Sequence, residues 1–365
     1  MRGKSARVRR APAKTGQSKR RGFSWKAFRE SSRTKKKAKR YVFLSLLLLL
    51  SAFALLALFA YKGITVPFAS AESSTASDFI NKRFVTVVYA TVADFKAHPL
   101  LVERVSFVLV DKEAKKAYEY EIPLSLTVDV PGKFGVESFE KILALGLVSG
   151  GDIRIGAGLL IKAVEKLFGY KVDRYIVQEE GTRLSFQKFL EGRMSLMDFE
   201  AGDIVQFGLA TKTDFSISEL YEIYRTVGFT SASGYEPKRF AEDFYSDSYK
   251  IDTEMRNISL GSQIAAERKS VAILNGTQIP GLAILGARAA GNMGAEVIVE
   301  KNARAFYDKS ILVVDSQDSE TAMVLGGFFN IDIVLTKEEA AYLSEDEAAR
   351  ADVTVIIGLD TAMGM

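Results

Sequence analysis

Val271-Ala272-Ile273-Leu274-Asn275-Gly276-Thr277 and the residues up to Val299 decide the fold of the C-terminal third of the chain. The apolar run 271–274 predicts a short buried strand, and Asn275-Gly276 predicts the turn that follows it. Pro280-Gly281 begins a helix that extends to about Met293, and Gly294 ends this helix before a second strand at 295–299. A strand, a helix and a strand in this order predict a βαβ-like unit with a right-handed crossover.

The same plan returns about forty residues later. The sequence predicts a strand at 311–314, a helix at 319–329, a strand at 331–335, a further helix at 337–349 and a last strand at 352–358. Two βαβ-like units predict a small α/β domain in which helices cover a sheet.

The region before this domain also mixes strands and helices. β-branched and aromatic runs predict strands at 84–92, 105–111, 117–122 and 172–178, and apolar periodicity predicts helices at 136–147, 152–168 and from 216 to about 227. Asp152 is the expected N-cap of the second helix, and Ser216 with Glu219 forms a capping box for the third. We therefore expect a layered α/β domain here.

Residues 42–60 (VFLSLLLLLSAFALLALFA) form an uncharged apolar run long enough to cross a bilayer as a helix. The basic cluster 35–40 precedes it, so the positive-inside rule places the N-terminus in the cytoplasm and the bulk of the chain outside. A cleaved signal peptide is the alternative, with Ala69-Ser70-Ala71 as the cleavage site. The long basic region and the long apolar run favour an uncleaved anchor.

Charge divides the chain into a basic arm and an acidic body. Residues 1–40 hold seventeen Lys or Arg and one acid, whereas residues 41–365 carry a formal charge of −12. The arm is too polar to fold alone and favours contact with anionic membrane lipid over nucleic acid. The chain has no cysteine and one histidine, His98, which excludes disulfides, thiolate chemistry and multi-histidine metal sites.

These patterns predict six segments. They are a cytoplasmic tail (1–40), a transmembrane helix (41–61), a stalk (62–82), a first α/β domain (83–230), a linker (231–269) and a C-terminal domain (270–362).

The first domain holds four motifs in a recognisable order, namely Tyr120–Pro123, Val128–Gly132, Gly150-Gly151 and the run from Ala163 to Tyr175. In order and spacing these motifs resemble the LytR-CpsA-Psr domain. The resemblance implies an extracytoplasmic transferase that moves a glycopolymer from a polyisoprenyl-pyrophosphate carrier to peptidoglycan. Such chemistry needs arginines for the pyrophosphate and carboxylates for Mg²⁺.

This sequence departs from the family at the site of that chemistry. The family pattern Ile-Pro-Arg-Asp is Ile122-Pro123-Leu124-Ser125 here, so an alkyl chain replaces the arginine that would bind phosphate. No catalytic residue is therefore predicted. Under the alternative that transfer survives, Arg104, Arg154 and Arg174 are the displaced arginines, and Mg²⁺ would be needed only in that case.

The C-terminal domain resembles the LytR C-terminal domain. The resemblance rests on Val271–Thr277, Gly281–Ala283 and Ala351–Asp360. Asn275, Gly276 and Gly281 lie in a strand-to-helix loop whose amides face a helix N-terminus, a geometry that attracts anions. The alternative is that Asn-Gly and Pro-Gly only form the turns, and no metal site is predicted.

We therefore expect a single-pass membrane protein of the cell envelope. The leading hypothesis is a non-catalytic protein that binds a wall polymer, a lipid-linked precursor or an envelope partner. The alternative is an active glycopolymer–peptidoglycan phosphotransferase.

Overall fold

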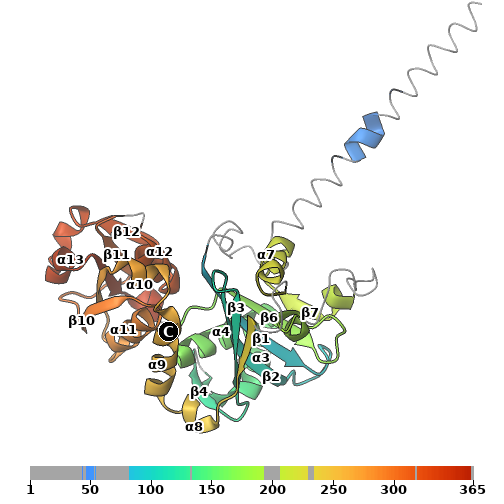
Figure 1. Ribbon diagram of the computed structural model, residues 1–365. Helices are drawn as coiled ribbons and strands as arrows, with labels where there is room; N and C mark the ends of the chain where they lie inside the picture. The colour runs from blue at the N-terminus through green and yellow to red at the C-terminus, as the bar shows by residue number, and fades with distance from the viewer. Residues whose placement is uncertain are drawn as a thin grey trace, which may run out of the picture. The chain divides into compact units, whose positions relative to one another are not determined.

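The computed structural model describes residues 43, 47–52, 54, 82–131, 134–192, 206–228, 234–316 and 319–362 (Figure 1). The chain divides into two compact units, residues 1–61 and 62–365. In the described part of the chain, no helix is both long and apolar enough to span a membrane. The predicted tail, most of the predicted span 41–61 and nearly all of the stalk lie outside the described residues.

A six-stranded mixed sheet organises the first half of the second unit. Its strand order is β7-β6-β1-β2-β3-β8. The strands are β1 (Phe84–Val92), β2 (Val102–Asp111), β3 (Lys116–Ile122), β6 (Arg174–Glu179), β7 (Thr211–Thr213) and β8 (Tyr235–Lys238). β1, β2 and β3 pair antiparallel, whereas β6 pairs parallel with β1 and β8 with β3. The predicted strands 105–111 and 117–122 are thus present as β2 and β3, and they form a hairpin.

Both faces of this sheet are buried because helices cover each of them. Alternate residues of β1, such as Val88 and Ala90, face α3 (Phe139–Gly150) and α4 (Ile153–Phe168). The intervening residues, such as Val85 and Val87, face α5 (Phe186–Leu190) and α7 (Ile217–Ile223). A period of two along a strand sends successive side chains to opposite faces, so this half has three layers. Two short strands, β4 (Thr127–Val130) and β5 (Gly135–Ser138), form a separate hairpin.

Local capping signals set the ends of the helices as predicted. The Asp152 carboxylate accepts a hydrogen bond from the Arg154 amide at the start of α4, and Gly169 ends the helix with a positive φ of 57°. Ser216 and Glu219 form the predicted capping box of α7. The helix predicted at 136–147 begins only at Phe139, because the residues before it pair as β5.

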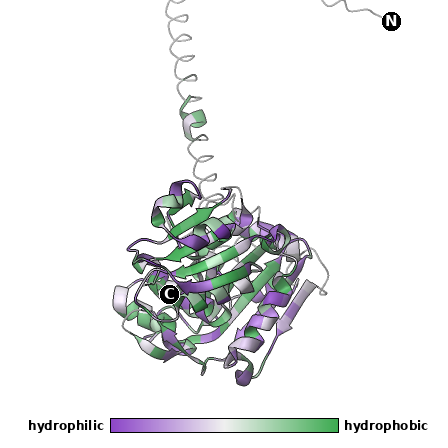
Figure 2. Ribbon diagram, turned by 90° about the vertical axis from the view of Figure 1, so that its left-hand side faces the viewer, coloured by the Kyte–Doolittle hydropathy of each residue, from purple (hydrophilic) through white to green (hydrophobic). Residues whose placement is uncertain are grey.

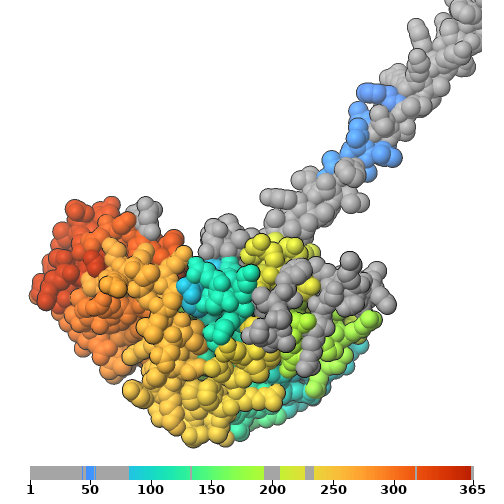
Figure 3. All heavy atoms as spheres, in the orientation of Figure 1, coloured from blue at the N-terminus to red at the C-terminus, as the bar shows by residue number. Residues whose placement is uncertain are grey.

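The prediction of a linker at 231–269 is wrong for its described part, 234–269. After β8 this segment forms α8 (Glu242–Tyr245), α9 (Ser248–Ser259) and α10 (Gln263–Glu267). α9 is polar on average, but Ile251 and Met255, four residues apart, are fully buried. α9 packs against both α4 and α11, and in Figure 3 the gold atoms of this segment lie against both halves of the unit.

A five-stranded sheet organises the C-terminal half, with the order β10-β9-β13-β11-β12. Its strands are β9 (Ser270–Asn275), β10 (Glu296–Asn302), β11 (Ile311–Val314), β12 (Ile333–Thr336) and β13 (Val353–Ile357). α11 (Leu282–Asn292) joins the parallel pair β9 and β10, and α12 (Glu320–Phe328) joins the parallel pair β11 and β12. The two predicted βαβ-like units are therefore observed.

One helix predicted for the C-terminal half is interrupted in the structure. The helix predicted at 337–349 is split into a 3-10 helix (Glu339–Leu343) and α13 (Asp346–Arg350) because Ser344 adopts a positive φ of 57° between them. A short α14 (Leu359–Ala362) follows β13. In Figure 2 many of the strands are green and much of the surrounding chain is purple, which agrees with two sheets whose inner strands are buried.

Candidate functional site

Arg104 is held by a buried carboxylate of the first sheet. Its guanidinium forms an ion pair of 2.8 Å with Glu119, whose side chain is only 1% exposed. It also donates to the side-chain oxygen of Gln187, and Glu119 accepts a second hydrogen bond from the Tyr235 hydroxyl. A guanidinium already paired with a buried carboxylate would leave that carboxylate uncompensated if it moved to a ligand.

Arg174 and Arg154 are also bound to carboxylates. Arg174 pairs with Glu219 at 2.6 Å, and both side chains are buried, so this ion pair joins β6 to the capping box of α7. Arg154 donates from Nε to Asp152, the N-cap of its own helix, at 2.7 Å. The three arginines thus bind three different carboxylates, and the structure does not bring them together as a clamp.

The turn after β3 holds Leu124 and Ser125 where the family pattern has arginine and aspartate. Leu124 packs against the core and its carbonyl accepts a hydrogen bond from the Glu140 amide of α3. The Ser125 hydroxyl donates to Glu242 of α8 at 3.3 Å. The turn is therefore tied to two helices and presents no guanidinium.

The Asn275–Gly281 loop is closed largely by its own hydrogen bonds. The Asn275 side chain accepts from the Thr277 amide at 3.0 Å and donates to the Ile279 carbonyl at 2.8 Å. The Gly276 amide donates to the Ile357 carbonyl, and Gly281 has a φ of 84° at the start of α11. Several amides of the loop are thus already used, and its predicted role in anion binding remains a prediction.

Arg288 of α11 joins the two halves of the unit at the end of α4. It pairs with Asp252 of α9 at 2.7 Å and donates to the carbonyls of Lys166 and Leu167 at 2.8 Å each. The Asn292 side chain donates to the next carbonyl, that of Phe168, at 2.9 Å. The last carbonyls of a helix lack partners within it, so these side chains complete α4 from the other half of the unit.

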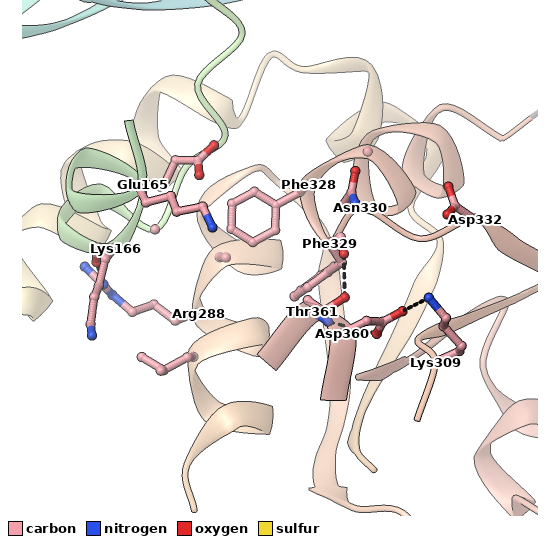
Figure 4. A pocket seen from close by; sticks show the side chains of 15 residues that line it. Glu165, Lys166, Arg288, Lys309, Phe328, Phe329, Asn330, Asp332, Asp360 and Thr361 are labelled. Carbon is pink, nitrogen blue, oxygen red and sulfur yellow. Dashed lines mark hydrogen bonds and ion pairs between the residues drawn. The ribbon is translucent and has the colours of Figure 1, made fainter. Parts of the chain in front are cut away.

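A cleft of about 470 Å³ opens beside this joint, and we call it the α4–α12 cleft (Figure 4). Lining residues from α4, α11 and the end of α12 carry side chains of both charges and two adjacent phenylalanines. The lining residues are Lys162, Glu165, Lys166, Gly169, Leu285, Arg288, Ala289, Lys309, Gly327, Phe328, Phe329, Asn330, Asp332, Asp360 and Thr361.

Phe328 is the half-buried aromatic group of the cleft. Figure 4 shows its ring between Glu165 and Lys166 on one side and Asn330 on the other. Phe329, packed edge-on against it at 4.9 Å between ring centroids, is buried in the core. Phe328 thus offers a supported apolar surface to a molecule in the cleft.

The charges of the cleft are partly satisfied by one another. The Lys309 Nζ atom lies 3.7 Å from the Asp360 Oδ2 atom, and Lys166 forms an ion pair with Asp129 outside the cleft. Lys162 is exposed and has no ion-pair partner among the described residues. Burial raises the pKa of Glu165 to about 7, although its hydrogen bond from the Val172 amide opposes this.

Sequence reasoning did not find this cleft. Glu165 and Lys166 belong to the run that carries the family resemblance, but Phe328 and Lys309 had no recognisable signal. Among the described residues, no three His, Asp or Glu side chains gather closely enough to hold a metal ion.

No protein-family model matches the chain, and no curated protein matches its sequence. Among solved structures the chain is similar to TagV of Bacillus subtilis, with 11% identity and a TM-score of 0.33 over 44% of this chain and 85% of that one. It is similar to a structure of TagT bound to LIIa-WTA, with 13% identity and a TM-score of 0.30 over 48% and 84%.

The chain is also similar to YwtF (TagT), a LytR-CPS2A-psr family protein with bound octaprenyl pyrophosphate lipid. The identity is 14% and the TM-score 0.31, over 54% of this chain and 96% of that one. The family of this structure is the one that the first domain resembles in sequence.

Proposed function

We propose that this chain is a membrane-anchored protein of the cell envelope that binds a wall glycopolymer outside the membrane and does not transfer it. The anchor and the sidedness rest on the apolar run 42–60 and the cations that precede it. The wall polymer as the ligand class rests on the sequence resemblance of both domains.

The proposal that the chain does not transfer the polymer rests on how its arginines are bound. A pyrophosphate needs several guanidinium or ammonium groups aimed at one place. Here Arg104, Arg154 and Arg174 each serve a separate carboxylate, and Leu124 stands in the turn where the family has an arginine. Arg174 is the least able of the three to leave its carboxylate for a ligand, because both Arg174 and Glu219 are buried.

The observation that carries the binding proposal is the α4–α12 cleft. It combines the Phe328 ring, on which the apolar face of a sugar can pack, with charged side chains that can bind hydroxyl and anionic groups. Its walls come from both halves of the unit, which Arg288 holds together. Ligand sites commonly lie at such junctions.

Binding of purified wall glycopolymer to the full-length protein in detergent tests the proposal. We expect Phe328→Ala to weaken binding about tenfold, the equivalent of about 1.4 kcal/mol. Phe306→Ala is the matched control, because Phe306 is 72% exposed and lies outside the cleft. No saturable binding by the parent chain, or equal losses in the two variants, would contradict the proposal.

A further inference from the structure

A second pocket lies where α4 begins, apart from the α4–α12 cleft. Its volume is about 420 Å³, and we call it the Tyr175 pocket. Asp152 and Arg154 line it from the start of α4, Tyr175 from β6 and Lys212 from β7. The proposed polymer cleft uses none of these four residues.

The Tyr175 hydroxyl is a buried polar group that has no hydrogen-bond partner among the described residues. The residue is 6% exposed, and no donor or acceptor of the described chain lies within bonding distance of its hydroxyl oxygen. The backbone around it is fixed, because its amide donates to the Asp214 carboxylate at 2.8 Å and its carbonyl accepts from the Thr213 hydroxyl at 2.6 Å. A buried hydroxyl left without a partner is unfavourable, so each such case needs an explanation.

The surroundings of this hydroxyl hold cationic donors as well as carboxylates. Burial raises the pKa of the Tyr175 hydroxyl above its ordinary value, the Asp214 and Asp152 carboxylates raise it further, and the Arg154 guanidinium opposes this rise. The phenol therefore stays protonated and is a hydrogen-bond donor. Lys212 lies 5.4 Å from the centre of the Phe95 ring and has no carboxylate partner among the described residues. The positive end of the sixteen-residue helix α4 faces the same place.

We propose that the Tyr175 pocket binds a phosphate group. A phosphate has enough acceptor oxygens to bond donors that come from three different elements, the guanidinium of Arg154, the hydroxyl of Tyr175 and the ammonium of Lys212. Asp152 keeps its role as the N-cap. The hydroxyl oxygen is shielded from solvent in this conformation, so binding requires a movement of the side chains that line the pocket. The Arg154 side chain is 57% exposed.

Titration of the full-length protein with inorganic phosphate, followed by thermal denaturation and by phosphorus NMR, tests this proposal. We expect saturable binding that Tyr175→Phe weakens at least tenfold. Because the hydroxyl bonds no group in the part of the chain that the structure describes, Tyr175→Phe should be no less stable than the parent chain when phosphate is absent. Lys212→Gln should also weaken binding and reduce its dependence on salt concentration.

Tyr249→Phe is the matched control, since Tyr249 is 77% exposed and lies outside the pocket. Glycerol 3-phosphate and a dialkyl phosphodiester, titrated in parallel, distinguish a terminal phosphate from a phosphate within a polymer or a lipid head group. The proposal fails if phosphate does not bind saturably, or if Tyr175→Phe binds phosphate as well as Tyr249→Phe does. It also fails if Tyr175→Phe unfolds more readily without phosphate, because the hydroxyl would then be structural.

Discussion

Replacing Glu165 by Gln should stabilise the chain at neutral pH, and the gain should disappear in acid. Burial raises the pKa of Glu165 from the ordinary 4.5 to about 7. Between these two values the folded chain holds a proton that the unfolded chain has lost, so the stability of the parent chain falls as the pH rises through this window. Each pH unit corresponds to about 1.4 kcal/mol, which gives up to about 3 kcal/mol in full.

Thermal or chemical denaturation from pH 4 to pH 8 measures this difference. Glu165→Gln should match the parent chain near pH 4 and exceed it above pH 7, with a melting temperature higher by roughly 6 °C. The exposed residue Glu296 supplies the control, since Glu296→Gln should show no such trend. A constant offset at every pH, or a loss of stability near pH 7, would show that the Glu165 carboxylate is ionised in the folded chain.

Two further substitutions test the joints of the fold. A Cβ at Gly146 of α3 would lie 2.2 Å from the Cα of Gly156 in α4, so Gly146→Ala should destabilise the fold by several kcal/mol. Gly158 of α4 is the control, because a Cβ there meets nothing within 4 Å, and Gly158→Ala should be neutral or stabilise by about 0.5–1 kcal/mol. Denaturant unfolding compares the pair, and equal effects would disprove the close helix contact. Arg288→Ala removes the cation from Asp252, which keeps only its hydrogen bond from Asn292, and removes the donors to the Lys166 and Leu167 carbonyls. It should cost about 3 kcal/mol by the same assay, and a cost below about 1 kcal/mol would show that Arg288 does not join the halves.

Local signals allowed much of the fold to be predicted from the sequence. The N-cap Asp152, the terminating Gly169 and the capping box of Ser216 are each decided by residues within one helical turn, so they could be read directly. The inner strands β9, β11 and β13 of the C-terminal sheet are almost entirely apolar, as expected for strands buried on both faces, whereas the edge strand β10 is mostly exposed.

Segments whose burial depends on distant partners were missed. α9 has few apolar residues, and only its packing between α4 and α11 shows that Ile251 and Met255 form a buried stripe. β8 is a short strand that contains Pro237, and it joins the sheet only because β3 offers a free edge.

The candidate site was also difficult to predict where it depends on contacts between distant parts of the chain. Arg104 was predicted as a possible phosphate ligand, although the register of the β2–β3 hairpin places Glu119 and Glu121 beside it. That register could have been built from the sequence. The α4–α12 cleft could not, because Glu165 and Phe328 are 163 positions apart and meet only when the two halves pack together.

The central claim is that the chain retains a wall polymer without transferring it. The most direct test incubates the full-length protein with a polyisoprenyl-pyrophosphate-linked glycopolymer, peptidoglycan and Mg²⁺. It then measures both the polymer retained by the protein and the polymer newly attached to peptidoglycan. We expect retained polymer and no new attachment. Attachment that requires Mg²⁺ and is abolished by Arg104→Ala would contradict the claim and show that displaced arginines sustain the transferase reaction.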